Sequence, residues 1–205
     1  MIPTGGNISG AGLVTADAVN ATATGSIGLN LAAASLDATA SGNITVTELD
    51  EVELGNVASA NGSVSIIGGH LTVNGTVNAN GSAYLEASSG NITGPGSVVS
   101  PSVLLFGFNG AIDLDTTAAT LTARGGYGVA IRNSGSLVLS KAESVYGNVT
   151  VAANGSLSVV EVVAGDNAAL TATGNLTVDA NGTGVTADDD LVLTGADQLV
   201  GHRDR

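Results

Sequence analysis

The stretch Gly62-Ser63-Val64-Ser65-Ile66 decides the fold prediction, because it joins a glycine and a small residue to two aliphatic residues at alternate positions. Side chains alternate between the two faces of a β-strand, so both aliphatic residues would point to one side. Segments 71–73 and 76–78 continue this alternation, and Gly-Gly and Asn-Gly pairs separate them from their neighbours. Residues 62–81 therefore predict short strands joined by tight turns.

The same phrase returns along the whole chain. Its leading positions are Gly25, Gly42, Gly62, Gly81, Gly110, Gly135, Gly155, Gly174 and, in a degenerate copy, Asp189. The spacing of these positions stays close to twenty, except for two longer steps, from Gly81 to Gly110 and from Gly110 to Gly135. A repeat of about twenty residues with two or three strands predicts an all-β parallel β-helix, a solenoid of about ten coils. We expect the glycines at the corners, where a positive φ is needed.

Composition agrees with a thin, repetitive core. The 205 residues include 30 glycines, only 2% aromatic residues and 43% hydrophobic residues, as expected when short aliphatic side chains fill a narrow coil. This hydrophobic content and the 11% charged residues exclude a disordered chain. A net charge of -13 with five basic residues argues against nucleic acid and anionic membranes as partners. No apolar run approaches the roughly 18 residues of a membrane-spanning helix, residues 1–25 lack a signal-peptide pattern, and cysteine is absent.

The recurring Asn-Gly-Ser-Val/Leu-Ser-Val/Ile phrases, together with residues 71–77 and 90–93, resemble the filamentous haemagglutinin-type repeats of large bacterial exoproteins. The resemblance implies a right-handed parallel β-helix that is exported to the cell surface or secreted. It also implies a structural or adhesive role as a stalk or fibre.

We expect residues 1–205 to form a single solenoid with irregular, longer coils at 81–134, where the two long steps fall. Loops that project from a solenoid commonly carry binding functions. The predicted binding residues in this region are Tyr84, Phe106, Phe108, Arg124, Tyr127 and Arg132. The alternative interpretation is that these aromatic side chains only cover the rod.

Two carboxylates suggest a rival function. Asp113 and Asp115 would both point outward from one strand, about 6–7 Å apart, which is near the separation in an inverting glycosidase. Counted from the leading glycines, Glu86 and Asp179 share the register of Asp115 and could add an acid to that face. A β-helical polysaccharide lyase or glycosidase is therefore the alternative, although a solvated outer face explains these acids better.

Further candidate sites are weaker. Asp188, Asp189 and Asp190 follow a glycine-containing turn and could hold calcium, a cation that prefers oxygen ligands. Glu48, Asp50, Glu51 and Glu53 form a second acidic cluster without a recognisable calcium-loop spacing. A further alternative is a glycan- or ice-binding module, and Thr-x-Thr pairs at Thr22, Thr45, Thr120 and Thr171 are the feature that suggests ice binding.

The two ends complete the prediction. Residues 1–10 and 194–205 contain no amphipathic helix that could cover a core cross-section. We therefore expect further β-helix at both ends, either from the rest of a longer chain or from head-to-tail self-assembly into a fibre. The sequence as a whole favours a non-enzymatic, extracellular rod with a structural or adhesive role, and host or surface glycans are its candidate partners.

Overall fold

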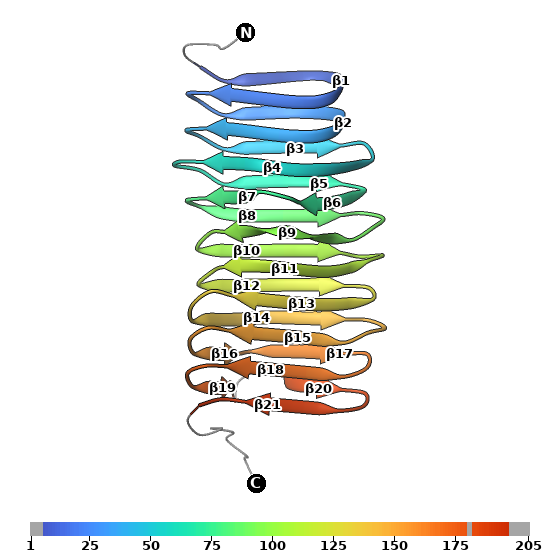
Figure 1. Ribbon diagram of the computed structural model, residues 1–205, viewed down its shortest axis with the longest axis vertical. Helices are drawn as coiled ribbons and strands as arrows, with labels where there is room; N and C mark the ends of the chain where they lie inside the picture. The colour runs from blue at the N-terminus through green and yellow to red at the C-terminus, as the bar shows by residue number, and fades with distance from the viewer. Residues whose placement is uncertain (1–5, 180–181, 197–205) are drawn as a thin grey trace.

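The computed structural model describes residues 6–179 and 182–196, which form one continuous stack of coils (Figure 1). Each coil crosses the molecule once in each direction, so the strands make two layers with the core between them. Every strand pair is parallel, and the described residues contain no helix. The predicted all-β parallel solenoid is confirmed.

The first two strands, β1 (Ile8–Ala23) and β2 (Ile27–Ala40), are long enough to belong to both layers. The first sheet continues through β3 (Ile44–Glu48), β5 (Val64–Gly68), β8 (Ser82–Ala87), β10 (Ser102–Gly107), β12 (Thr120–Gly125), β14 (Leu137–Ser144), β16 (Leu157–Val159), β17 (Glu161–Ala164), β19 (Leu176–Val178) and β20 (Gly184–Ala187). The second sheet continues through β4 (Glu51–Ser59), β6 (His70–Val73), β7 (Thr76–Ala79), β9 (Ile92–Val99), β11 (Ala111–Thr117), β13 (Gly128–Asn133), β15 (Val149–Ala153), β18 (Ala168–Ala172) and β21 (Leu191–Thr194).

The coils are nearly equal in length. One column of paired residues in the first sheet runs through all ten coils, at positions 8, 27, 44, 64, 83, 103, 121, 139, 159 and 178. No step in this column is shorter than seventeen positions or longer than twenty. The whole stack therefore keeps one period, close to nineteen positions per coil.

The longer coils expected at 81–134 are absent, and that prediction is wrong. Through this region the column passes from Ala83 to Val103, Leu121 and Leu139, in steps as short as those elsewhere in the stack. The phrase that begins at Gly110 lies in β11 of the second sheet, whereas the phrase at Gly81 lies in β8 of the first sheet. The long steps in the sequence therefore lead from one layer to the other and do not mark longer coils.

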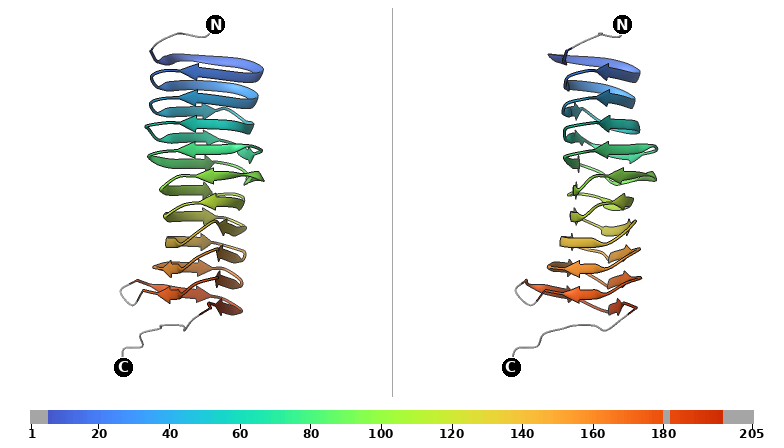
Figure 2. Two further views of the ribbon diagram at one scale, coloured as in Figure 1. Left: turned by 60° about the vertical axis from the view of Figure 1, so that its left-hand side comes forward. Right: turned by 90° about the vertical axis from the view of Figure 1, so that its left-hand side faces the viewer.

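An aliphatic core fills the space between the two sheets. Leu85 and Leu105 face inward from the first sheet and Leu54 and Leu114 from the second, each with 0% of its surface exposed. Strands about 4.8 Å apart stack these side chains into columns parallel to the long axis. No aromatic residue of the described segments belongs to this core. The turned views show the resulting narrow rod (Figure 2).

Asn133 is one of six buried polar residues among the described segments, and it lies in an inward column. It stacks between Thr116 and Ala153 with only 3% of its surface exposed. Its Oδ1 accepts hydrogen bonds from the Thr116 hydroxyl and the Ala118 amide, both at 2.9 Å. Its Nδ2 donates to the carbonyl oxygens of Ala118 and Gly135, both at 3.2 Å. The buried amide is therefore fully paired.

The small polar residues that follow Gly6, Gly25, Gly42 and Gly62 form what we call the polar ladder. The Oδ1 of Asn7 accepts from the Ser26 amide at 2.8 Å, and the Ser26 hydroxyl accepts from the Asn43 amide at 3.1 Å. Asn43 and Ser63 repeat this contact with the amides of Ser63 and Ser82 at 2.9 and 3.1 Å. In each step a side-chain oxygen of one coil binds the backbone of the next coil. The ladder explains the preference for Ser or Asn at this position in these coils.

The leading glycines are required for close backbone approach, and the expected positive φ is the wrong reason for most of them. Among the described glycines, only Gly6, Gly94, Gly128, Gly135 and Gly184 have positive φ. A Cβ at Gly62 would lie 2.8 Å from both the Asn43 nitrogen and the Gly42 carbonyl carbon of the preceding coil. Stacked turns come too close at this corner for any side chain.

Replacing Gly62 with alanine should therefore destabilise the rod by about 1–3 kcal/mol, because the stacked turns must move apart. Gly28→Ala is a matched control, since a Cβ there meets nothing within 4 Å. We expect Gly28→Ala to be neutral or to stabilise by about 0.4–1 kcal/mol by restricting the unfolded chain. Urea unfolding of both variants measures the difference. Equal stabilities would contradict the role of close approach.

Candidate functional site

The two edges of the flattened solenoid have different surfaces. At one edge the chain passes from the first sheet to the second, which is the right-hand edge in Figure 1. Phe108, Tyr127 and Tyr146 lie there, and we call it the aromatic edge. Tyr84 in β8 and Phe106 in β10 point outward from the neighbouring face of the first sheet. All five aromatic residues of the chain therefore lie on this edge and the face beside it.

Ring contacts join these aromatic residues in two groups. The centroids of Tyr84 and Phe106 are 5.5 Å apart and those of Phe106 and Phe108 are 5.8 Å apart. Tyr127 and Tyr146 form the second pair, at 5.7 Å. Burial and a hydrogen bond to the Glu86 carboxylate raise the pKa of Tyr84 to about 12, so its hydroxyl stays protonated. The structure thus brings five of the six predicted binding residues to one edge and its neighbouring face, all except Arg132, and no projecting loop carries them.

The sequence prediction missed Tyr146. This residue lies one coil beyond Tyr127, and its side chain is 70% exposed. Phe108, Tyr127 and Tyr146 follow one another at equal intervals in the sequence, and the interval equals the period of the solenoid. A search with the correct period would have found the third ring.

Arg124 adjoins the aromatic residues on the first sheet, but its charge is already paired. It stacks beside Phe106 and binds Glu143 at 3.0 Å, and Lys141 binds Glu143 at 3.0 Å and Glu161 at 2.9 Å. Burial raises the pKa of Glu143, but the hydrogen bonds and charges of Lys141 and Arg124 outweigh this effect and lower it overall. Hydrogen bonds to Glu161 and Glu143 raise the pKa of Lys141. Glu143 and Lys141 therefore stay charged at neutral pH, and both are held in ion pairs.

Arg132 lies on the other sheet, away from the aromatic residues. It stacks beside Asp115 and reaches both acids of that strand, with Nη1 2.7 Å from Asp113 and Nε 2.5 Å from Asp115. These hydrogen bonds raise the pKa of the arginine. Asp113 and Asp115 point outward as predicted, and they share one counter-charge.

The expectation that Glu86 and Asp179 lie on the face of Asp115 is wrong. Glu86 stacks against Phe106 in the first sheet, and Asp179 follows β19 in the same sheet. Asp115 belongs to β11 in the second sheet. The error has the same origin as the predicted longer coils. Asp115 is counted from Gly110, which precedes a strand of the second sheet, whereas Glu86 and Asp179 are counted from Gly81 and Gly174, which precede strands of the first sheet.

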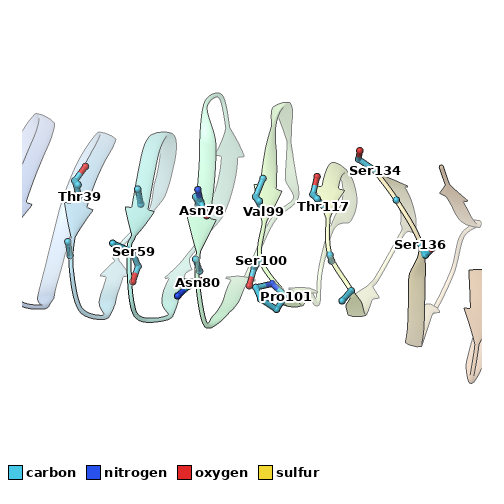
Figure 3. A pocket seen from close by; sticks show the side chains of 17 residues that line it. Thr39, Ser59, Asn78, Asn80, Val99, Ser100, Pro101, Thr117, Ser134 and Ser136 are labelled. Carbon is cyan, nitrogen blue, oxygen red and sulfur yellow. The ribbon is translucent and has the colours of Figure 1, made fainter. Parts of the chain in front are cut away.

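A shallow groove follows the opposite edge, where the chain returns from the second sheet to the first. Its volume is about 860 Å³, and its wall is built from small or short polar side chains of successive coils. Thr39, Asn78, Thr117 and Ser134 line it along the axis, with Pro101 in the turn (Figure 3). The buried Ser100 hydroxyl donates to a carbonyl oxygen of Gly81 or Ser102, at 3.0 Å from each. The groove carries no charged group and no aromatic ring among its lining residues.

The predicted calcium-binding residues lie in one turn but do not converge on a common point. Asp188, Asp189 and Asp190 are exposed in the turn after β20, and no group of three acidic or histidine side chains within 6–179 and 182–196 is arranged to hold a metal ion. In the other acidic cluster, Glu48 is only 4% exposed. Its carboxylate accepts hydrogen bonds from the backbone amides of Ala33 and Leu49.

The fold and the surface define a class, the two-layered parallel β-solenoid with an aromatic edge. No family model, curated protein or solved structure matches the chain. Among the described residues there is no helix with the length and apolar character needed to cross a membrane.

Proposed function

We propose that this protein is a structural and adhesive rod of the cell surface or of a secreted assembly, and that it has no enzymatic activity of its own. One observation carries the proposal: the same stacked coil repeats along the stack, and its strongest departure is a concentration of aromatic side chains on the outside. The resemblance to haemagglutinin-type repeats points to the same role.

The ion pairs favour a structural reading of the acidic residues. In a glycosidase pair, one carboxylate must hold a proton and the other must act as base or nucleophile. Asp113 and Asp115 instead both bind the guanidinium of Arg132, so neither carboxylate is held apart for a separate role. The arrangement supports an ion pair on the outer surface. The degradation assay described below tests the alternative that the protein is an enzyme.

The end coils support further β-solenoid as a partner. Val14 in β1 is 40% exposed, whereas Leu31, its partner in the next coil, is 0% exposed. Leu191 in β21 is 46% exposed, whereas its partner Ala168 is 1% exposed. Apolar positions that interior coils bury are thus open at both ends of the described stack. The partner is a further coil, from the rest of a longer chain or from a second copy.

Bead adhesion combined with a degradation assay tests the function. Beads coated with the protein should be retained on some members of a panel of immobilised polysaccharides and matrix proteins. The soluble protein should release no sugar fragments from the same polysaccharides. Beads coated with an unrelated acidic protein control for charge.

Two results would overturn the proposal. Fragments produced by the wild-type protein and lost in Asp113→Asn would establish the enzyme instead. Beads that bind no surface on the panel would remove the adhesive role.

A further inference from the structure

Three exposed aromatic rings follow one another on the aromatic edge, one in each of three successive coils. Phe108, Tyr127 and Tyr146 are 49%, 65% and 70% exposed. The positions one period before and after this series, 89 and 165, hold serine and glycine. The rings therefore form a short platform of defined length, about three coils long.

The platform does not contribute to the core. The interior of each coil is filled by aliphatic side chains, and the rings lie outside it. Tyr127 and Tyr146 touch each other, while Phe108 leans on Phe106. Exposed aromatic groups with a polar surround are typical of binding surfaces, because each ring offers a large, rigid apolar area to a ligand.

The charges around the platform select an uncharged ligand. All three Arg and Lys side chains within the described residues, Arg124, Arg132 and Lys141, are held in ion pairs with acids of the same chain. An anionic polysaccharide would find no unpaired counter-charge there and would be repelled by the net charge of -13. Neutral amide residues adjoin the rings in the sequence, since Asn109 follows Phe108 and Asn148 lies two residues after Tyr146.

A pyranose sugar matches this combination. One face of the sugar ring presents C–H groups over an area similar to an aromatic ring, while its rim carries hydroxyl groups for amide side chains. The rise of about 4.8 Å per coil is close to the length of one sugar residue in an extended chain. We propose that the aromatic edge binds a neutral polysaccharide chain that lies along the solenoid axis, with one sugar against each ring. This inference rests on the proposed adhesive function and names its ligand.

Affinity electrophoresis tests the site. The gels contain a soluble neutral polysaccharide, either a β-1,4-linked glucan or a galactomannan, and separate gels contain polygalacturonate as the anionic probe. The wild-type protein should be retarded by a neutral polysaccharide and not by polygalacturonate. The double variant Tyr127→Ala/Tyr146→Ala should lose affinity by a factor of about ten or more, because two of the three rings of the platform are removed. Tyr127→Phe/Tyr146→Phe should retain the retardation, because the rings remain.

Leu49→Ala is the matched control. Leu49 lies on the same edge, several coils away, and is 67% exposed, so its loss removes apolar surface but no ring. Its retardation should equal that of the wild-type protein, and unchanged thermal unfolding midpoints would show that all variants fold.

Any of three results would overturn the inference. The wild-type protein is not retarded by either neutral polysaccharide, it prefers polygalacturonate, or the alanine double variant binds as well as the wild type. The bead assay separates this failure from failure of the proposed function. If beads that carry the alanine double variant adhere as well as wild-type beads, the proposed adhesive function stands. Only the assignment of the ligand site to the aromatic edge is then wrong.

Discussion

Leu105→Ala is expected to lower the free energy of unfolding by about 2–5 kcal/mol. Leu105 is fully buried in β10, in a column between Leu85 and Ala123 of the adjacent coils. Its truncation leaves a cavity that neighbouring coils cannot fill, because backbone hydrogen bonds fix their separation. Urea denaturation followed by circular dichroism measures the change.

Leu104→Ala gives the matched comparison in the same strand. Leu104 points outward between Tyr84 and Thr122, so its truncation should cost much less than that of Leu105. Equal losses for the two variants would contradict the assignment of inward and outward faces.

Asn133→Leu is expected to destabilise the rod by about 3 kcal/mol or more. Leucine has a similar size, but it leaves the Thr116 hydroxyl and the amide and carbonyl of Ala118 without their hydrogen-bond partner. Each buried unpaired group costs about 1–3 kcal/mol. Thermal and urea unfolding measure this loss.

A double variant makes the test specific. Thr116→Val/Asn133→Leu removes both side-chain partners of one hydrogen bond and continues the aliphatic column of Val98. It should therefore be more stable than the sum of the two single changes predicts. Strict additivity would show that the Thr116–Asn133 contact does not contribute to stability.

The parallel solenoid could be predicted from the sequence because alternation and period are properties of local spacing. The coil lengths at 81–134 could not, because a glycine followed by alternating aliphatic residues is needed at both edges. The phrase at Gly110 therefore looks like the phrase at Gly81, although they lie in different sheets. A single repeated phrase does not identify the layer to which it belongs.

The candidate site was predicted only in part for the same reason. Tyr84, Phe106, Phe108 and Tyr127 do gather, but Arg132 faces the other side of the molecule. The pairing of Arg132 with Asp115 joins strands of successive coils, and only the register reveals it. The burial of Asn133 could not be predicted either, because it depends on the column formed by neighbouring coils.

The polar ladder gives the stack a direction of growth. In each of its steps, the earlier coil supplies the side-chain acceptor and the later coil supplies the backbone donor. A folded coil thus offers the incoming chain an oxygen that is already in place, whereas growth toward the N-terminus requires the incoming side chain to be ordered at the same time. We therefore expect the ladder to favour the addition of coils from the N-terminal end toward the C-terminal end.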